Sequence, residues 1–172
     1  MKKTLALAAF ALAAAHSFAG VSTMAVAQNS GRGDVVDMLA SRGQFKTLLS
    51  LVKRANLTAQ LRDPLPITVF APTDAAFAKV PKKTLETILS SQEILQEVLL
   101  YHVVPADANL AVLQPDVQIP SYTGYAIRFN RRGSLVRVDN VPVVRANIRA
   151  TNGVIHTIDS VLLPPRFTGR WR

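Results

Sequence analysis

The spacing of hydrophobic residues predicts helices in the first half of the chain. Asp34 is suited to cap a helix that carries apolar residues up to position 39 and ends near Gly43. The next apolar residues recur at positions i, i+3, i+4 and i+7, which is the spacing of one helical face; they are Phe45, Leu48, Leu49 and Val52. Prolines at positions 64 and 66 then favour extended backbone and end the helical pattern.

A short strand and three further helices are predicted between residues 67 and 101. Residues 67–71 are rich in strand-forming side chains and are followed by Pro72. Thr73 or Asp74 would cap a brief helix, Pro81 would open a second, and a third would begin after Ser91. The apolar positions that these helices would bury are Phe77, Leu85, Ile88, Leu89, Ile94, Leu95, Val98 and Leu99.

From about Val117 onward the apolar residues recur with a period of two, which indicates strands. Turns are expected at residues 131–133 and at Asn140, and Asn152 with Gly153 is expected to form a tight type I′ turn because both residues tolerate positive φ. The last strand would cover residues 154–161. Helices followed by a meander of strands predict an α+β fold, with the helices packed on one side of a mainly antiparallel sheet.

The N-terminus has the features of a secretory signal peptide. Lys2 and Lys3 precede an uncharged apolar stretch at residues 5–15, and small residues follow at 25–27 and, as a weaker cleavage site, at 17–19. An uncleaved anchor is disfavoured because the apolar core is shorter than the ~20 residues of a spanning helix. We therefore expect a signal peptide at 1–27, a linker at 28–33, a folded domain at 34–165 and a basic tail at 166–172.

Composition narrows the function classes further. The absence of cysteine excludes a disulfide scaffold, a thiolate metal site and a cysteine nucleophile. The chain has 20 Lys and Arg against 11 Asp and Glu; removal of Lys2 and Lys3 with the signal peptide would lower its formal charge from +9 to +7. With 49% hydrophobic residues it has the composition of a folded domain. The expected mature protein is basic, exported to the periplasm or secreted, and free of thiols.

Three segments in this order resemble the signature segments of the fasciclin domain family. The first is Thr68-Val69-Phe70-Ala71-Pro72-Thr73-Asp74-Ala75-Ala76-Phe77, the second is Tyr101-His102-Val103-Val104, and the third is Asn152-Gly153-Val154-Ile155-His156-Thr157-Ile158-Asp159-Ser160-Val161-Leu162-Leu163-Pro164. Their order and spacing fit one domain. The resemblance implies a wedge of β-strands with a cluster of helices, in secreted or surface-anchored proteins that take part in adhesion, matrix contact or ligand binding rather than catalysis.

The Tyr-His pair is a candidate partner-binding site. The resemblance implies this role for Tyr101 and His102, because this region of animal fasciclin domains is implicated in integrin-dependent adhesion. The residues themselves favour another interpretation, since His102 and His156 lie in apolar company and a hydrogen-bonded core histidine is the commoner case. Neither histidine has the further ligands that a zinc site needs, so we expect no metal and no cofactor.

The sequence does not indicate an enzyme. Strand alternation places His156 and Ser160 on one face and Asp159 on the other, which does not suit a catalytic triad, and there is no phosphate-binding or dinucleotide-binding glycine motif. Arg32-Gly33-Asp34 spells a tripeptide that integrins recognise. However, Asp34 is also well suited to cap the helix that follows, and Asp37 would favour the positive start of that helix. This structural interpretation is the stronger one.

Arginines alternate with the apolar residues of the predicted strands. Several of them would share an exposed sheet face that attracts polyanions such as acidic polysaccharide, lipopolysaccharide phosphates or extracellular DNA. The alternative is a solvated surface whose arginines prevent strand-to-strand aggregation. No motif or aromatic platform indicates sequence-specific binding of nucleic acid. The candidates are Arg128, Arg131, Arg132, Arg137, Arg145 and Arg149.

Two functional hypotheses follow. The first is a non-enzymatic adhesion or matrix-binding module of a bacterial envelope, matrix or biofilm, whose partner is a surface or matrix protein or an acidic glycan. Because adhesion by a single copy lacks avidity, we expect it to act as a homo-oligomer or as a soluble matrix component. The second is a carrier of an apolar small molecule, similar to the carotenoid-binding fasciclin proteins of algae, held between helices and sheet. Residues that would line such a cleft are Met38, Phe45, Phe70 and Phe77.

Overall fold

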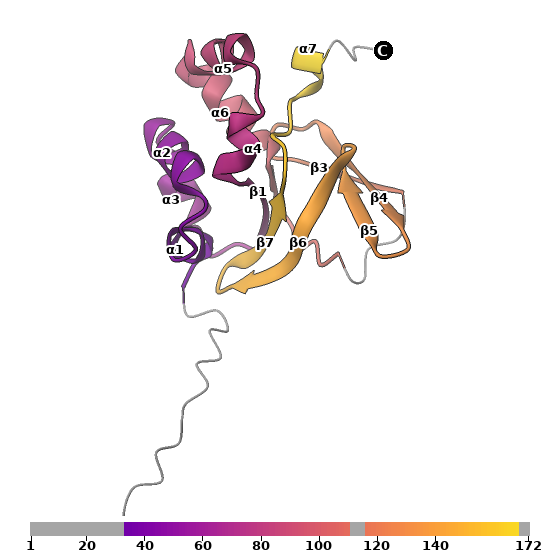
Figure 1. Cartoon of the computed structure of the whole chain (residues 1–172). Helices are drawn as coiled ribbons and strands as arrows, with labels where there is room; N and C mark the ends of the chain where they lie inside the picture. Colours follow the sequence, from indigo (N-terminus) through magenta and orange to yellow (C-terminus); the bar gives the residue numbers. More distant parts are fainter. Residues whose placement is uncertain (1–32, 111–115, 169–172) are drawn as a thin grey trace, which may run out of the picture.

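A computed structural model of the chain describes residues 33–110 and 116–168 (Figure 1). The expected signal peptide at 1–27, most of the linker and the end of the tail lie outside the described residues. Helices and a strongly curved sheet form two sides of the domain, so the predicted α+β class is confirmed. Within the described ranges, no helix is both long and apolar enough to span a bilayer.

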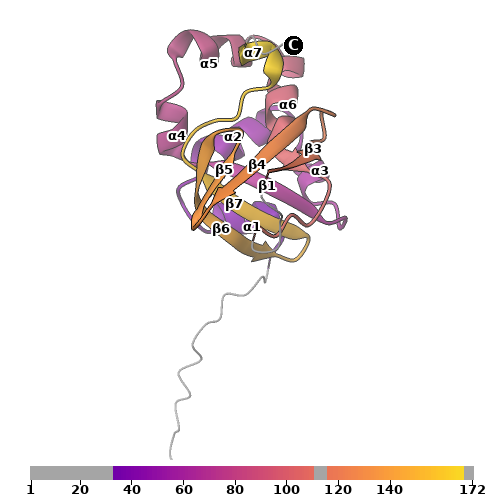
Figure 2. The ribbon, with the colours of Figure 1, turned by 90° about the vertical axis from the view of Figure 1, so that its right-hand side faces the viewer.

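In the described part of the chain, helices α1 to α6 lie on one side of the sheet, and all of them except α3 are in the order that the sequence predicts (Figures 1 and 2). Side-chain oxygens of Asp34 and Thr73 cap two of them, as expected, and Ser91 caps the helix predicted to begin after it. The short α3 was not predicted, because its four residues are too few to establish a periodic pattern. The helices are α1 (Val35–Ala40), α2 (Lys46–Arg54), α3 (Thr58–Leu61), α4 (Asp74–Ala78), α5 (Lys82–Leu89) and α6 (Gln92–Tyr101).

Seven strands form the sheet, in the spatial order β2-β1-β7-β6-β5-β4-β3. Among the strands of the described residues, the β1–β7 pair is parallel and the other pairs are antiparallel. A short helix, α7 (Pro165–Thr168), follows the last strand. The strands are β1 (Ile67–Pro72), β2 (Val103–Val104), β3 (Val117–Pro120), β4 (Ala126–Arg132), β5 (Leu135–Val138), β6 (Val141–Ala150) and β7 (Gly153–Ile158).

Two hydrophobic clusters use the opposite faces of β1 and β7. Val69 and Ile155 face the helices and belong to the larger cluster. Phe70 and Ile158 face the other way, into a second cluster enclosed by the curved sheet. Strands β1 and β7 are therefore buried on both faces, as parallel strands usually are. Burial on both faces explains why the first signature segment, which contains most of β1, and the third, which contains β7, are rich in apolar residues.

A tight turn connects β6 to β7 near the predicted place, but it consists of Thr151 and Asn152, and the predicted type I′ geometry at Asn152 and Gly153 is wrong. Neither residue has a positive φ, whereas Asp139 and Asn140 have φ of 49° and 71° and connect β5 to β6 directly. Two consecutive positive φ values are what a type I′ turn requires. Gly153 is needed for another reason: a Cβ at this position would lie 1.9 Å from the carbonyl oxygen of Ile67 on β1. The glycine therefore permits close approach of two parallel strands.

The simple alternation predicted along β6 is also wrong. Register shifts separate Val143 from Arg145 and Arg145 from Ile148, and Asn147 has a positive φ of 58°. These irregularities turn Val144 outward, so that 66% of it is exposed, while Ile148 remains buried. Strand β7 ends at Ile158, and residues 161–164 run as an irregular segment to Pro165, the first residue of α7; we call residues 161–165 the strap.

Candidate functional site

Tyr101 lies at the end of α6 with its hydroxyl directed at the β5–β6 turn. Only 3% of the residue is exposed. Its hydroxyl donates to Oδ2 of Asp139 at 2.5 Å, and Oδ1 of the same carboxylate accepts the backbone N–H of Arg128 at 2.9 Å. Burial and the Asp139 carboxylate together raise the pKa of Tyr101 well above its usual value. Tyr101 therefore fixes the turn to the helical half of the domain.

His102 is a buried bridge between α6 and the strap. Its Nδ1 lies 2.7 Å from the carbonyl oxygen of Val98, and its Nε2 accepts the backbone N–H of Leu162 at 2.9 Å. Since the carbonyl can only accept and the N–H can only donate, the imidazole is neutral with its proton on Nδ1. Burial lowers the pKa of His102 to about 4. The predicted core role is thus observed, and the partner-binding role of the Tyr-His pair stays a prediction.

His156 has the opposite tautomer. Its Nδ1 accepts the N–H of Asn147, at the irregularity of β6, and its Nε2 donates to the carbonyl of Ala108. The ring stacks on Phe70 with centroids 5.4 Å apart. Burial lowers its pKa to about 4, although the nearby Asp107 opposes this shift and Arg149 adds to it. Ser160 bonds to Asp159 rather than to His156, so these three residues do not assemble a triad.

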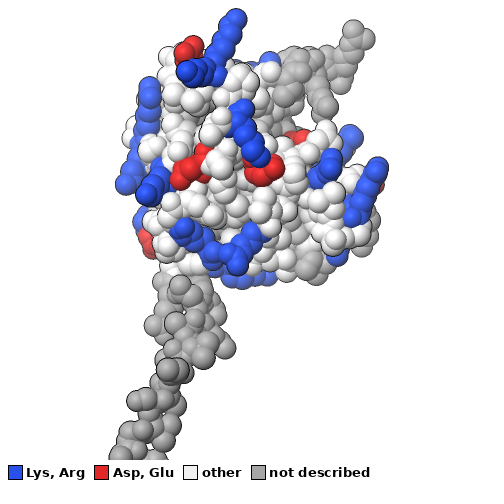
Figure 3. Space-filling model, in the orientation of Figure 1, with Lys and Arg blue, Asp and Glu red and all other residues white. Residues whose placement is uncertain are grey.

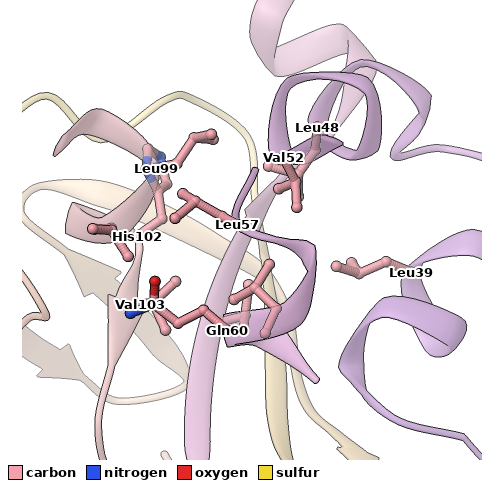
Figure 4. Close-up of a pocket in the computed structure, with 11 residues that line it drawn as sticks. Leu39, Leu48, Val52, Leu57, Gln60, Leu99, His102 and Val103 are labelled. Atoms are coloured by element: carbon pink, nitrogen blue, oxygen red, sulfur yellow. The ribbon is translucent and has the colours of Figure 1, made fainter. Parts of the chain in front are cut away.

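The space between helices and sheet is small. A narrow apolar pocket beside His102 is lined by Leu57 and Gln60 near α3, by Leu48 and Val52 of α2 and by the end of α6 (Figure 4). The cavity volume of this pocket is about 20 Å³, and a second pocket that also borders His102 has a volume of about 10 Å³. The first holds about one water molecule. The predicted carrier residues are all buried in the core: Met38, Phe45, Phe70 and Phe77.

Three of the candidate arginines gather on strands β4 and β5. In the antiparallel register Asn130 pairs with Arg137 and Arg132 pairs with Leu135, and paired residues lie on the same face. These residues line an open hollow with a free volume of about 320 Å³. No salt bridge involves Arg128, Arg132 or Arg137 within residues 33–110 and 116–168. We call the surface formed by Arg128, Asn130, Arg132, Leu135, Arg137 and Asn140 the arginine surface.

The other candidate arginines do not belong to this hollow. Arg131 precedes the turn and its Nε donates to the carbonyl of Gly133. Arg145 and Arg149 lie on β6, opposite strand β7, and Arg149 forms an ion pair with Asp107 at 2.7 Å. Figure 3 shows basic side chains at the right-hand edge, over the β4–β5 hairpin, and others dispersed over the rest of the visible face. The prediction of one basic sheet face therefore applies to part of the set only.

A larger hollow separates the strap from the strands. Its free volume is about 660 Å³, within the usual range for ligand sites. The strap contributes apolar side chains to its lining, while Gln118 of β3, Arg128 of β4 and the β5–β6 turn contribute polar ones. The bonds of Tyr101 to the turn and of His102 to the strap set the positions of both segments. We call this hollow the strap groove.

Asp34 caps helix α1, as the structural interpretation of the Arg32-Gly33-Asp34 tripeptide predicts. Its Oδ1 accepts the N–H of Asp37, and its Oδ2 pairs with Arg62 at 2.6 Å. Arg32 lies outside the described residues, so the structure does not place the whole tripeptide. In the part of the chain that the structure describes, His, Asp and Glu side chains form no cluster of three or more suited to a metal ion.

Comparison with known proteins places this geometry in a family. The family model described as Fasciclin domain matches residues 43–164. The chain is 40% identical over 133 residues to protein sll1483 of Synechocystis, with 76% of this chain and 73% of the relative covered. It is 32% identical to immunogenic protein MPB70 of Mycobacterium bovis, with 77% of this chain and 70% of the relative covered.

A longer relative and a solved structure are also similar to this chain. The chain is 36% identical to transforming growth factor-beta-induced protein ig-h3 of Sus scrofa over 77% of its own length, but spans only 20% of that protein. The fold is similar to that of a domain pair from the insect cell adhesion molecule Fasciclin I, with a TM-score of 0.66 and 19% identity; 79% of this chain and 52% of that chain are covered. Members of the family are generally non-catalytic. The chain belongs to the fasciclin domain family of adhesion and matrix-associated modules.

Proposed function

We propose that this protein is a non-enzymatic adhesion or matrix-binding module whose arginine surface contacts an acidic glycan. The observation that carries the proposal is the grouping of Arg128, Arg132 and Arg137, none of which has a salt-bridge partner among the described residues. A guanidinium group binds carboxylate and sulfate oxygens through two parallel hydrogen bonds. Such contacts give attraction to an acidic glycan without requiring catalysis or a cofactor.

The Tyr-His pair would contribute to this function by positioning the segments around the groove. Tyr101 and His102 are too deeply buried to form a contact surface themselves. They hold the β5–β6 turn and the strap, which flank the polar side chains of the strap groove. A change in either residue would therefore alter binding through the walls of the groove, and a protein partner that reads this surface would be affected in the same way.

The proposed setting is the periplasm or the outside of the cell. The N-terminal sequence supports export, with cleavage after Ala27. Because one module has no avidity, adhesion would require several copies, either as a homo-oligomer or along a repetitive glycan.

The test is retention of the protein on immobilised heparin and alginate as a function of salt. The variant Arg128→Gln, Arg132→Gln, Arg137→Gln should elute at clearly lower salt than the wild type. The matched control Lys53→Gln, Lys82→Gln, Lys83→Gln removes the same charge from exposed helix positions and should shift elution much less. Equal shifts for the two triple variants would show that net charge alone causes retention, and no retention of the wild type at low salt would refute the proposal.

A further inference from the structure

The arginine surface and the strap groove share a residue. Asn140 lines both hollows, and Arg128 of the strap groove lies on the same strand as Asn130 and Arg132 of the other. At about 3.3 Å per residue, Arg128 and Arg132 are roughly 13 Å apart along β4. Positive charges are thus spaced along the trough that these two adjoining hollows form, with Arg137 beside Asn130. A small anion in one hollow would not contact all three arginines, because Arg128 lines one hollow and Arg132 and Arg137 line the other.

We propose that this trough binds one linear acidic polysaccharide chain, which lies extended across both hollows; this inference rests on the proposed function. The two hollows have free volumes of about 320 and 660 Å³, which suits several consecutive sugars rather than one. The carboxylate or sulfate groups of the chain would pair with the arginines at each end.

The remaining lining fits sugar rather than another polyanion. Amide side chains of Gln118 and Asn140 both donate and accept, as hydroxyl groups require. The apolar side chains of the strap, with Val161 and Leu163, offer contacts to the C–H faces of sugar rings. Asp139 is the only carboxylate that lines these two hollows in the described chain, and both of its oxygens already accept hydrogen bonds, from Tyr101 and Arg128.

Two other extended ligands fit less well. Single-stranded nucleic acid is usually held by exposed aromatic platforms, and the one aromatic residue among those lining the hollows, Tyr101, is 97% buried. An extended peptide gains affinity by pairing with a free strand edge. The arginines of the trough lie on β4 and β5, each of which is already paired on both sides, so a peptide could pair only with the outer edge of β3.

Binding of oligosaccharides of defined length tests the inference. Oligouronates from alginate and sulfated oligomers from heparin, each from two to twelve sugars long, would be titrated into the purified protein at low salt. We expect the binding affinity to rise at least tenfold with oligosaccharide length until the trough is filled. The affinity for each trough should then stay constant for longer oligomers. Arg128→Gln and Arg132→Gln should each weaken binding of long oligomers several-fold, while Arg128→Lys, which keeps the charge, should weaken it less. Lys82→Gln is the matched control.

The outcomes separate the inference from the proposed function. If long chains bind through Arg132 and Arg137 but Arg128→Gln has no effect, or if affinity does not depend on length, the ligand occupies one hollow and the inference fails while the proposed function stands. If single-stranded oligonucleotides or acidic peptides of equal charge bind as tightly, the assignment to polysaccharide fails. If neither glycan binds at low salt, the proposed function itself fails. Thermal unfolding of each variant checks that the exposed substitutions leave the fold intact.

Discussion

Acid should destabilise this domain well before its carboxylates titrate. His102 and His156 are neutral and buried, and each uses one ring nitrogen to accept a backbone N–H. Protonation would remove that acceptor and place a charge in the core. Burial lowers both pKa values from 6.5 to about 4, so in this interval the unfolded chain binds more protons than the folded chain. Stability is therefore fully present above about pH 7 and falls as the pH drops toward 4.

The magnitude follows from the pKa shifts. A shift of one pKa unit corresponds to about 1.4 kcal/mol, so each histidine would lower the free energy of unfolding by roughly 3 kcal/mol between pH 7.5 and 4, and by roughly 2 kcal/mol at pH 5. Together they would remove about 4 kcal/mol at pH 5, a large part of the ~5–15 kcal/mol of a typical domain. The pKa of Asp74 is lowered chiefly by the backbone N–H of Thr47, so its contribution to stability is lost only as the pH falls below its usual pKa and does not vary in this window.

The assay is urea unfolding at pH 8, 7, 6 and 5, followed by far-ultraviolet circular dichroism. We expect the unfolding free energy to be constant from pH 8 to 7 and then to fall. The slope should approach the value for two additional protons bound by the unfolded chain. The variant His102→Gln, which has no titrating ring, should show about half of this dependence. Equal stability at pH 8 and 5, or an NMR titration of either imidazole near 6.5, would refute the reasoning.

Three substitutions test other parts of the structure. Gly153→Ala should lower the unfolding free energy by about 3 kcal/mol or more, because its Cβ would overlap the carbonyl of Ile67 and force two strands apart; thermal unfolding measures this, and a loss below 1 kcal/mol would contradict it. Asn152→Ala should cost about 2–4 kcal/mol, since it leaves the buried N–H of Val35 and two carbonyl groups without their partner; a neutral result by the same measurement would show that water replaces the amide. Asp34→Glu should leave the attachment of integrin-bearing cells unchanged, because this carboxylate serves the helix cap; abolished attachment would instead support recognition of the tripeptide.

Local patterns predict much of this fold. Helix starts at Asp34, Thr73 and Ser91 follow from capping, which involves only neighbouring residues. The split of β7 into two buried faces follows from strict alternation. Both kinds of signal lie within one segment, and the structure agrees with them.

Features that depend on distant contacts could not be predicted in this way. The turn expected at Asn140 is present, but its pair of positive φ values and the bond of the Asp139 side chain to Tyr101, 38 residues away, were not predicted. The irregularity of β6 at Asn147 is held by His156 of the neighbouring strand. For the same reason the sequence indicates which arginines lie on strands but not which of them share a hollow, since β6 departs from simple alternation.

The central claim is that contact with the glycan occurs on strands β3–β5 and the strap, not on the helices. The most direct measurement is a map of amide chemical shifts of the isotope-labelled protein during titration with an acidic oligosaccharide. We predict that residues 117–120, 126–140 and 161–165 shift together, with saturation, and that α1 to α5 do not. Shifts centred on the helical side, or small shifts spread over every exposed lysine and arginine, would contradict the account.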